Sequence, residues 1–160
     1  MGIRTYFYNK VGEKMEVLNV YLSGAMSGLS LDEMTKWRRN FNNAVMFSDY
    51  KDYDDFVKKP VFFDPTFYYL PTENYHKSER EAMEFDLYNL RRSDLVVVNL
   101  SKLDSVGTIM ELILAKEYKI PVIAFGAGNQ NIHPWIHECC TRICDNMREA
   151  VNHVIDYYLC

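Results

Sequence analysis

One acidic side chain, Glu111, stands where a carboxylate could act as a nucleophile. It follows Thr108 by three residues, in the expected first turn of a helix that begins just beyond a buried strand. A helix N-terminus favours negative charge and so keeps a carboxylate ionised, as attack on an anomeric carbon requires. The same Thr-x-x-Glu spacing is also a capping box, in which Glu111 would have only a structural role. Spacing alone leaves both interpretations open.

A second carboxylate, Asp86, falls within a predicted helix among apolar residues. The apolar face of that helix is marked by Ala82, Met83, Leu87 and Leu90. A buried Asp is costly unless it is paired or catalytic, and partial burial raises the pKa of a carboxyl group. Asp86 would then suit a general acid that protonates a leaving base. The alternative is an Asp at the edge of the face, paired with Arg80 or Arg91.

Two more polar residues lie on or beside predicted strands. Tyr21 is on the first strand, next to a loop of small residues, where its hydroxyl could orient the nucleophile. A Tyr that only packs in the core is the commoner outcome. Asp94 opens another strand and either caps the preceding turn or touches the site.

Short apolar runs alternate with helical patterns along the chain. Strands are predicted at 17–22, 61–63, 95–100, 121–125 and 141–144, and helices at 30–45, 78–92, 108–118 and 147–158. The run 95–100 is apolar throughout, as in a parallel sheet that is covered on both faces. Strands that alternate with helices imply right-handed βαβ connections. We therefore expect a three-layer α/β fold, Rossmann-like and flavodoxin-like.

Ligands of such sheets bind beyond the carboxyl ends of the strands. This rule selects three loops: Ser23 to Gly28, Asp64 to Lys77, and Ser101 to Gly107. The first and third hold small residues ahead of a helix, whose amides can bind phosphate or hydroxyl oxygens. Neither matches a Walker A or G-x-G-x-x-G pattern, so no ATP, NAD or other cofactor is expected. The segment from Thr66 to Lys77 is long enough to suspect a functional lid.

Composition and charge narrow the class of protein. The 160 residues are 48% hydrophobic and 25% charged with a net charge of −4, which is typical of a globular protein without a basic patch. Long nucleic acids are therefore not expected as partners. The segment Met1 to Met15 has no apolar signal core, and no apolar run reaches membrane-spanning length. We expect residues 1–160 to form a single domain in the cytoplasm, with no membrane partner.

Cysteine and histidine residues gather late in the chain. The four cysteines are Cys139, Cys140, Cys144 and Cys160. Disulfides are not expected without a secretory signal. His133 and His137 lie nearby, but the C-x2-C spacing of structural zinc sites is missing, so we predict small buried thiols and no metal. His133 and Trp135 could reach a site on this or a neighbouring subunit.

Several segments together, in their order and spacing, resemble the nucleoside 2-deoxyribosyltransferase family. They are 20–26 (VYLSGAM), 64–65 (DP), 84–87 (EFDL), 93–98 (SDLVVV) and 105–112 (SVGTIMEL). The likeness spans Val17 to Phe125. It implies a Rossmann-like parallel sheet of about five strands, as in other doubly wound folds, and a homodimer or larger homo-oligomer.

The resemblance also implies roles for particular residues. Glu111 matches the Glu that attacks the anomeric carbon and forms a 2-deoxyribosyl-enzyme, Asp86 the Asp that holds and protonates the base, and Tyr21 the Tyr that positions the nucleophile. Substrate contacts are expected from Ser23, Gly24, Met26, Asp64, Asp94, Ser105 and Gly107. The chemistry is retaining glycoside cleavage, in which a second base or water takes the sugar.

Two positions bear on the choice of reaction. Six residues before Glu111 the transferases often carry a carboxylate near the sugar 5′ oxygen, whereas this chain has Ser105, with Asp104 adjacent. A Ser there resembles the related 2′-deoxynucleoside 5′-monophosphate N-hydrolases, whose hydroxyl and amides receive a phosphate. Those hydrolases tend to have an Arg in the first loop, where this chain has Ser27.

Three functions follow as expectations. The first is a nucleoside 2-deoxyribosyltransferase, whose partners are a small-molecule nucleoside or nucleotide and a free nucleobase. The second is a 2′-deoxynucleoside 5′-monophosphate N-hydrolase that releases free base. The third is a non-catalytic nucleotide-binding module, and a generic flavodoxin-like domain is a separate alternative.

Overall fold

The computed structural model describes residues 7–8, 12, 14–69 and 75–160. Its strands are β1 (Phe7–Tyr8), β2 (Lys14–Gly24), β3 (Lys58–Phe63), β4 (Leu95–Asn99), β5 (Val122–Phe125) and β6 (Arg142–Ile143). Its α-helices are α1 (Leu31–Met46), α2 (Glu79–Arg91), α3 (Val106–Glu117), α4 (Pro134–Cys139) and α5 (Met147–Val154). Helix α5 continues as a π-helix over Ile155–Leu159, and short 3-10 helices cover Tyr53–Asp55 and Pro65–Tyr68.

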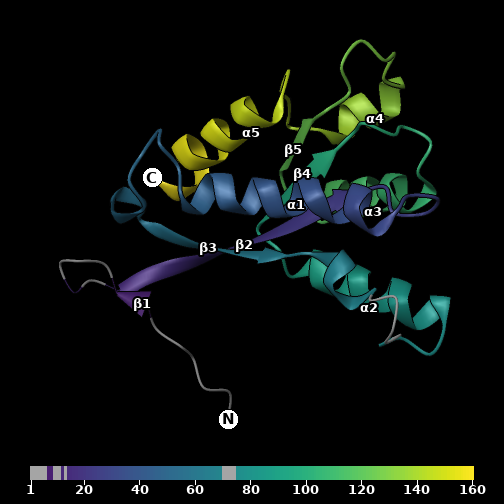
Figure 1. Cartoon of the computed structure of the whole chain (residues 1–160), viewed down its shortest axis with the longest axis horizontal. Coiled ribbons are helices and arrows are strands. Elements are labelled where there is room, and N and C mark those ends of the chain that lie inside the picture. Colours follow the sequence, from purple (N-terminus) through teal and green to yellow (C-terminus); the bar gives the residue numbers. More distant parts are fainter. Residues whose placement is uncertain (1–6, 9–11, 13, 70–74) are drawn as a thin grey trace.

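The sheet is parallel through five strands in the order β3, β2, β4, β5, β6. Helices lie on both sides of it, so the predicted three-layer α/β fold is confirmed (Figure 1). The register aligns Gly24 with Asn99 and Asn99 with Phe125, which places the carboxyl ends of β2, β4 and β5 at one edge. That edge is where ligands of such sheets bind.

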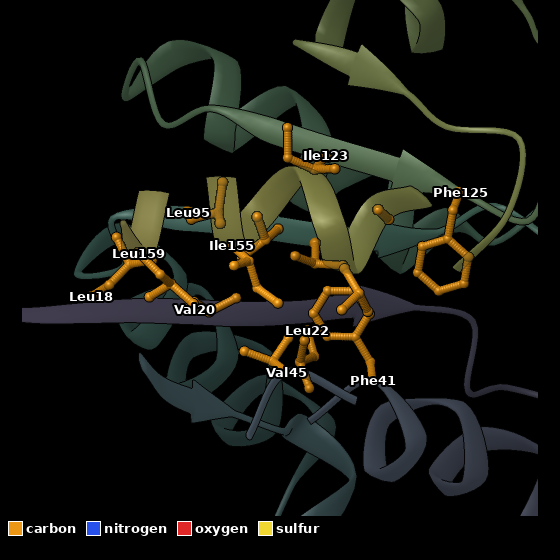
Figure 2. Packing of buried hydrophobic residues seen from close by; sticks show 14 of the residues in the cluster. Leu18, Val20, Leu22, Phe41, Val45, Leu95, Ile123, Phe125, Ile155 and Leu159 are labelled. Atoms are coloured by element: carbon orange, nitrogen blue, oxygen red, sulfur yellow. The ribbon is translucent and has the colours of Figure 1, made fainter. Parts of the chain in front are cut away.

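Each face of the sheet has its own apolar cluster, because side chains along a strand alternate between faces. Leu18, Val20 and Leu22 of β2 lie with Ile155 and Leu159 at the end of the chain, as Figure 2 shows. The other face packs against α2, α3 and α4. In Figure 1, α2 lies on the opposite side of β2 and β3 from the yellow α5.

Besides shifted ends of several elements, three details differ from the sequence prediction. The short strand β1 pairs antiparallel with the start of β2. The segment around His133, expected as a loop, forms α4, because Pro134 occupies the first turn and His133 accepts a hydrogen bond from the Trp135 N–H. The suspected lid begins as a 3-10 helix over Pro65–Tyr68, and residues 70–74 of it lie outside the described residues.

No helix in the described part of the chain is long and apolar enough to cross a membrane.

Removing the Phe41 ring should test the cluster on the α1 and α5 face. Phe41 is fully buried and its ring packs against Phe62 and Phe125. We expect Phe41→Ala to lower the free energy of unfolding by about 3–5 kcal/mol through lost contacts and a cavity. Phe47→Ala is the control, because that ring is 83% exposed. Urea denaturation measures both, and equal losses would contradict the assigned packing.

Candidate active site

Two hydroxyl side chains point from β2 toward the α2 and α3 face. Because the side chains alternate, Tyr21 and Ser23 share that face, while Val20 and Leu22 belong to the cluster on the other one. Tyr21 and Ser23 are both fully buried. Their position near the carboxyl end of β2 places the hydroxyl groups beside the first two turns of α3.

Both hydroxyl groups donate to the carboxylate of Glu111. The Tyr21 hydroxyl lies 2.7 Å from Glu111 Oε1, and Ser23 Oγ lies 2.5 Å from Glu111 Oε2. The Glu111 residue is only 9% exposed. Each carboxylate oxygen therefore has its own donor, which fixes the plane of the group. The structure thus brings together Tyr21, Ser23 and Glu111, and it gives Ser23 a positioning contact that the sequence did not indicate.

Helix α3 begins earlier than the sequence suggested. Its N-cap is Ser105, whose Oγ accepts from the Thr108 N–H at 3.5 Å and from the Thr108 hydroxyl at 2.9 Å. Glu111 is therefore the sixth helical residue, in the second turn. The interpretation of Thr108 and Glu111 as a capping box is wrong, because Ser105 already caps the helix and Glu111 bonds across to β2.

The pKa of Glu111 is subject to opposing effects. Burial is the largest of them and raises the pKa of Glu111 overall, while the hydrogen bonds from Ser23 and Tyr21 and the charge of Arg38 oppose that rise. Burial also raises the pKa of Tyr21 well above its ordinary value, with a further contribution from Glu111, so Tyr21 remains a proton donor to the carboxylate. The groups that favour the ionised form of Glu111 are these hydroxyls and Arg38, in place of the helix N-terminus expected from the sequence.

Asp86 lies on α2 and is 6% exposed. Its Oδ2 is 3.5 Å from the Tyr69 hydroxyl, and its Oδ1 has no hydrogen-bond partner among the described residues. Burial, with the charge of Glu111, raises the pKa of Asp86 to about 7. Such a carboxyl group holds a proton through much of the neutral range and can give it up, as a general acid must.

The alternative ion pairs of Asp86 are not found. Arg80 pairs with Glu84 at 2.9 Å, and the Arg91 guanidinium lies 5.8 Å from the centre of the Tyr118 ring. Tyr69 was not among the residues singled out from the sequence. The sequence did single out the loop that contains Tyr69. The feature that could have identified Tyr69 itself is an aromatic residue with a hydroxyl group near the end of a predicted strand.

Arg38 is a second residue that the sequence analysis missed. It is 1% exposed and donates to the carbonyl oxygens of Leu22 at 3.2 Å and Gly24 at 2.9 Å, and also to that of Met34. Its Nε also lies 3.6 Å from Asp64 Oδ1. A buried guanidinium needs such partners. The feature of the sequence that could have identified Arg38 is a charged residue among the apolar residues that recur at helical spacing in α1.

Asp64 is placed differently from the other candidates. Its Oδ1 accepts from the Thr66 N–H at 2.9 Å and the Thr66 hydroxyl at 2.6 Å, which begins the 3-10 helix after β3. It lines a separate cavity of about 590 Å³ beside α1, together with Arg38 and Arg39. Asp64 therefore contacts Arg38, whose charge also acts on Glu111.

Asp94 lies at the opposite edge of the sheet. Its Oδ2 accepts from the backbone N–H of Asn19 at 2.8 Å and from the Asn19 side-chain amide at 3.1 Å. It precedes β4, whose first residue pairs with Val20, whereas the site lies at the carboxyl ends of the strands. The expected substrate contact from Asp94 is wrong, because the residue before a parallel strand sits at its amino edge.

Glu111 is shared by two hollows. The first, called the α2 pocket, has a volume of about 150 Å³ and is lined by Met26, Tyr69, Glu79, Met83, Asp86, Leu87, Gly107, Met110 and Glu111. The second, called the loop pocket, has a volume of about 260 Å³ and is lined by Gly24, Met26, Ser27, Lys102, Asp104, Ser105, Val106, Gly107, Thr108 and Glu111. A substrate that spans both would pass directly over the carboxylate.

The loop pocket is rich in groups that attract oxygen atoms. It contains the start of α3, where the N–H groups of Val106 and Gly107 have no partner within the helix. Lys102 belongs to the loop that leads into α3 and reaches across to the first loop, where its ammonium lies 3.4 Å from the Ser27 carbonyl oxygen. Exposed Asp104 also lines it. The pocket therefore suits hydroxyl or phosphate oxygens.

The late cysteine and histidine residues lie apart from these hollows. All four cysteines are free thiols. Among the described residues, no group of three His, Cys, Asp or Glu side chains could hold a metal ion. His133 and Trp135 line a fourth, largely apolar cavity of about 370 Å³ between α3 and α4, away from Glu111.

The raised pKa of Asp86 should make stability depend on pH. A group whose pKa rises on folding, here from 3.8 to about 7, stabilises the fold most below pH 4, and this contribution is lost as pH rises through about 7. We therefore expect Asp86→Asn to gain stability relative to the natural protein between pH 5 and pH 8. Urea denaturation of both proteins at the two pH values measures the difference.

Glu149→Gln is the control for this experiment. A hydrogen bond from Arg142 lowers the pKa of Glu149, so that group is ionised at both pH values. Its substitution should change stability equally at pH 5 and pH 8. A constant difference for Asp86→Asn as well would contradict the raised pKa.

Comparison with known proteins was made by sequence and by structure. No protein-family model matches the sequence, and no curated protein matches it significantly. In structure the chain is similar to a 2-deoxyribosyltransferase from Bacillus psychrosaccharolyticus, with 18% identity, a TM-score of 0.61 and coverage of 87% of this chain and 91% of that chain.

Two further solved structures are similar. A conserved protein from Enterococcus faecalis V583 has 13% identity, a TM-score of 0.63 and coverage of 86% of this chain and 97% of that chain. A CMP N-glycosidase from Clostridium botulinum has 13% identity, a TM-score of 0.48 and coverage of 87% and 99%. The chain thus has the fold of a 2-deoxyribosyltransferase, as the resemblance in its sequence predicted.

Proposed function

We propose that this chain cleaves the N-glycosidic bond of a 2′-deoxynucleoside through a deoxyribosyl-Glu111 intermediate and transfers the sugar to another nucleobase. One observation supports it above the others. The Glu111 carboxylate, held by Tyr21 and Ser23, lies between a pocket with a protonatable Asp86 and a pocket with oxygen-binding groups. The fold shared with a 2-deoxyribosyltransferase is consistent with that arrangement.

The first half of the reaction uses both carboxyl groups. The base lies in the α2 pocket and the 5′ end of the sugar in the loop pocket, so that the anomeric carbon faces Glu111. A Glu111 oxygen bonds to that carbon as the C–N bond breaks, and the electron pair of that bond stays on the base nitrogen. The proton of Asp86 passes to the base, which leaves neutral.

The second half reverses these steps with a new acceptor. A second base enters the α2 pocket and its ring nitrogen attacks the anomeric carbon. The bond to Glu111 breaks, the carboxylate is restored, and the N–H proton of the incoming base returns to Asp86. Two displacements give overall retention at the sugar.

The environments of the two carboxyl groups suit these different tasks. Asp86 has a weak donor in Tyr69 and a pKa of about 7, so it can hold a proton near neutral pH. Glu111 has two close hydroxyl donors, which stabilise negative charge on its oxygens. The hydrogen bonds distinguish the two groups, because burial raises the pKa of both carboxyl groups.

Substitutions at the nucleophile and its donor test this mechanism. We expect Glu111→Gln to abolish the exchange, because an amide cannot form the glycosyl ester. Tyr21→Phe should lower kcat by about 10- to 100-fold, the value of a hydrogen bond to a charged group. Chromatography of 2′-deoxycytidine incubated with adenine measures the appearance of 2′-deoxyadenosine.

Tyr118→Phe is the matched control, because that Tyr is exposed on the far end of α3. It should leave the rate unchanged. Full activity of Glu111→Gln would rule out the covalent intermediate. A protein that binds nucleosides tightly and turns none over would instead indicate a binding module.

A second candidate function is hydrolysis of 2′-deoxynucleoside 5′-monophosphates, with water as the acceptor. The observation that favours it is the Lys102 ammonium beside the unpaired amides of α3 in the loop pocket. A phosphate would gain charge-assisted hydrogen bonds there. The same nucleophile and acid serve both reactions.

Replacing Lys102 separates the two candidates. If a 5′-phosphate is the natural group, Lys102→Met should lower kcat/KM for 2′-deoxycytidine 5′-monophosphate by about 10-fold or more, because a charged hydrogen bond is lost. The rate for 2′-deoxycytidine should not change. Release of free base is measured with and without a second base, and Lys36→Met, at an exposed position of α1, is the control. Loss of both activities alike would contradict a phosphate-specific role.

A further inference from the structure

The first turns of α2 present a stripe of residues to the α2 pocket. Glu79, Met83 and Asp86 follow one another at i, i+4 and i+7, which is one face of a helix. All three line the pocket. Glu79 is the first residue of the helix and Asp86 lies near the anomeric end, so the two carboxyl groups mark opposite ends of the stripe.

The separation of these two residues matches a planar base between them. Seven helical residues rise about 10 Å. This backbone spacing is of the order needed for a heteroaromatic ring with a hydrogen bond of about 3 Å to a carboxyl group at each end. Met83 and Met110 line the pocket with flexible apolar side chains that suit contact with ring faces.

Tyr69 and Glu79 line the same pocket. Burial raises the pKa of Tyr69 to about 12, and the charges of Asp86, Glu79 and Glu111 add to that effect. Tyr69 donates its proton to Asp86 Oδ2, so toward a ligand its oxygen can only accept. Glu79 itself is exposed to solvent and lines the pocket at the start of α2, so its carboxylate lies at the open end of the pocket.

The polar groups of the α2 pocket are mostly acceptors. None of the nine described lining residues is a Lys, Arg or His. Asp86 Oδ1 is buried without a partner among the described residues, and it is the position from which a proton can pass to the base. Carboxylate oxygens at Glu79 accept hydrogen bonds and do not donate them. A ring with an oxo group at this position would place that oxygen, a hydrogen-bond acceptor, against the Glu79 carboxylate, which is also an acceptor.

We propose that the α2 pocket selects a nucleobase with an exocyclic amino group, and that Glu79 is the residue that accepts a hydrogen bond from it. This inference rests on the proposed function for the placement of the base. It adds the class of base: cytosine or adenine in preference to uracil or hypoxanthine. Glu79 is a specificity-determining residue that takes no part in bond cleavage.

Matched substrates that differ only at this group test the inference. The full chain is assayed with 2′-deoxycytidine against 2′-deoxyuridine and with 2′-deoxyadenosine against 2′-deoxyinosine, each also as the 5′-monophosphate. The natural protein should prefer the amino member of each pair by about 10- to 100-fold in kcat/KM, the value of a hydrogen bond to a charged group. Glu79→Gln should reduce or reverse this ratio, because its amide can donate to an oxo group.

Glu84→Gln is the control, since Glu84 is on the same helix, pairs with Arg80 and does not line the pocket. It should leave the ratio unchanged. Equal turnover of amino and oxo substrates, or a ratio that Glu79→Gln does not alter, would overturn the inference and leave the proposed function intact.

Absence of any turnover would overturn the proposed function, and a binding measurement then tests the selectivity separately. Calorimetry with the Glu111→Gln variant compares cytosine with uracil and adenine with hypoxanthine. Tighter binding of the amino bases, lost on adding Glu79→Gln, supports the inference. Binding of both members alike contradicts it.

Discussion

The burial of one carboxylate governs the arrangement around this site. Glu111 is almost completely removed from water, and an unpaired charge there would be strongly unfavourable. Hydroxyl groups from β2 satisfy both of its oxygens, and the Arg38 charge lies close enough to lower its pKa. Arg38 comes from the helix on the opposite face and bonds the Gly24 carbonyl oxygen. A Cβ at Gly24 would come within 2.9 Å of the Trp37 ring, so glycine permits that close approach.

The two-residue period of β2 makes this arrangement strict. Val20 and Leu22 contribute to one apolar cluster while Tyr21 and Ser23 contribute to the site on the other face. A slip of one residue would bury the hydroxyl groups in the apolar cluster and place Leu22 against Glu111. Stability of the core and positioning of the carboxylate therefore select the same register, and neither can change alone.

The sequence allowed the layers and the main candidates to be predicted, because apolar periodicity and the α/β ligand rule depend on local pattern. It did not allow the start of α3 to be predicted: Ser105 and Thr108 are both good caps three residues apart, and the path of the preceding loop decides between them. Arg38 was missed because its partners are backbone carbonyls of a strand distant in sequence. The wrong assignment of Asp94 as a substrate contact was avoidable, since a residue that opens a parallel strand lies at its amino edge.

The two pockets around Glu111 differ in the sign of the charge on the groups that line them. The α2 pocket offers carboxyl oxygens from Glu79 and Asp86, whereas the loop pocket offers the Lys102 ammonium and free amides, with exposed Asp104 beside them. A molecule with donors at one end and oxygen atoms at the other is therefore oriented by charge before it is fitted by shape. Reversal would set acceptors against carboxylates and donors against an ammonium group. In the proposed reaction this polarity would set which bond of the substrate faces Glu111, and Glu79 and Lys102 contribute to it from outside the reacting centre.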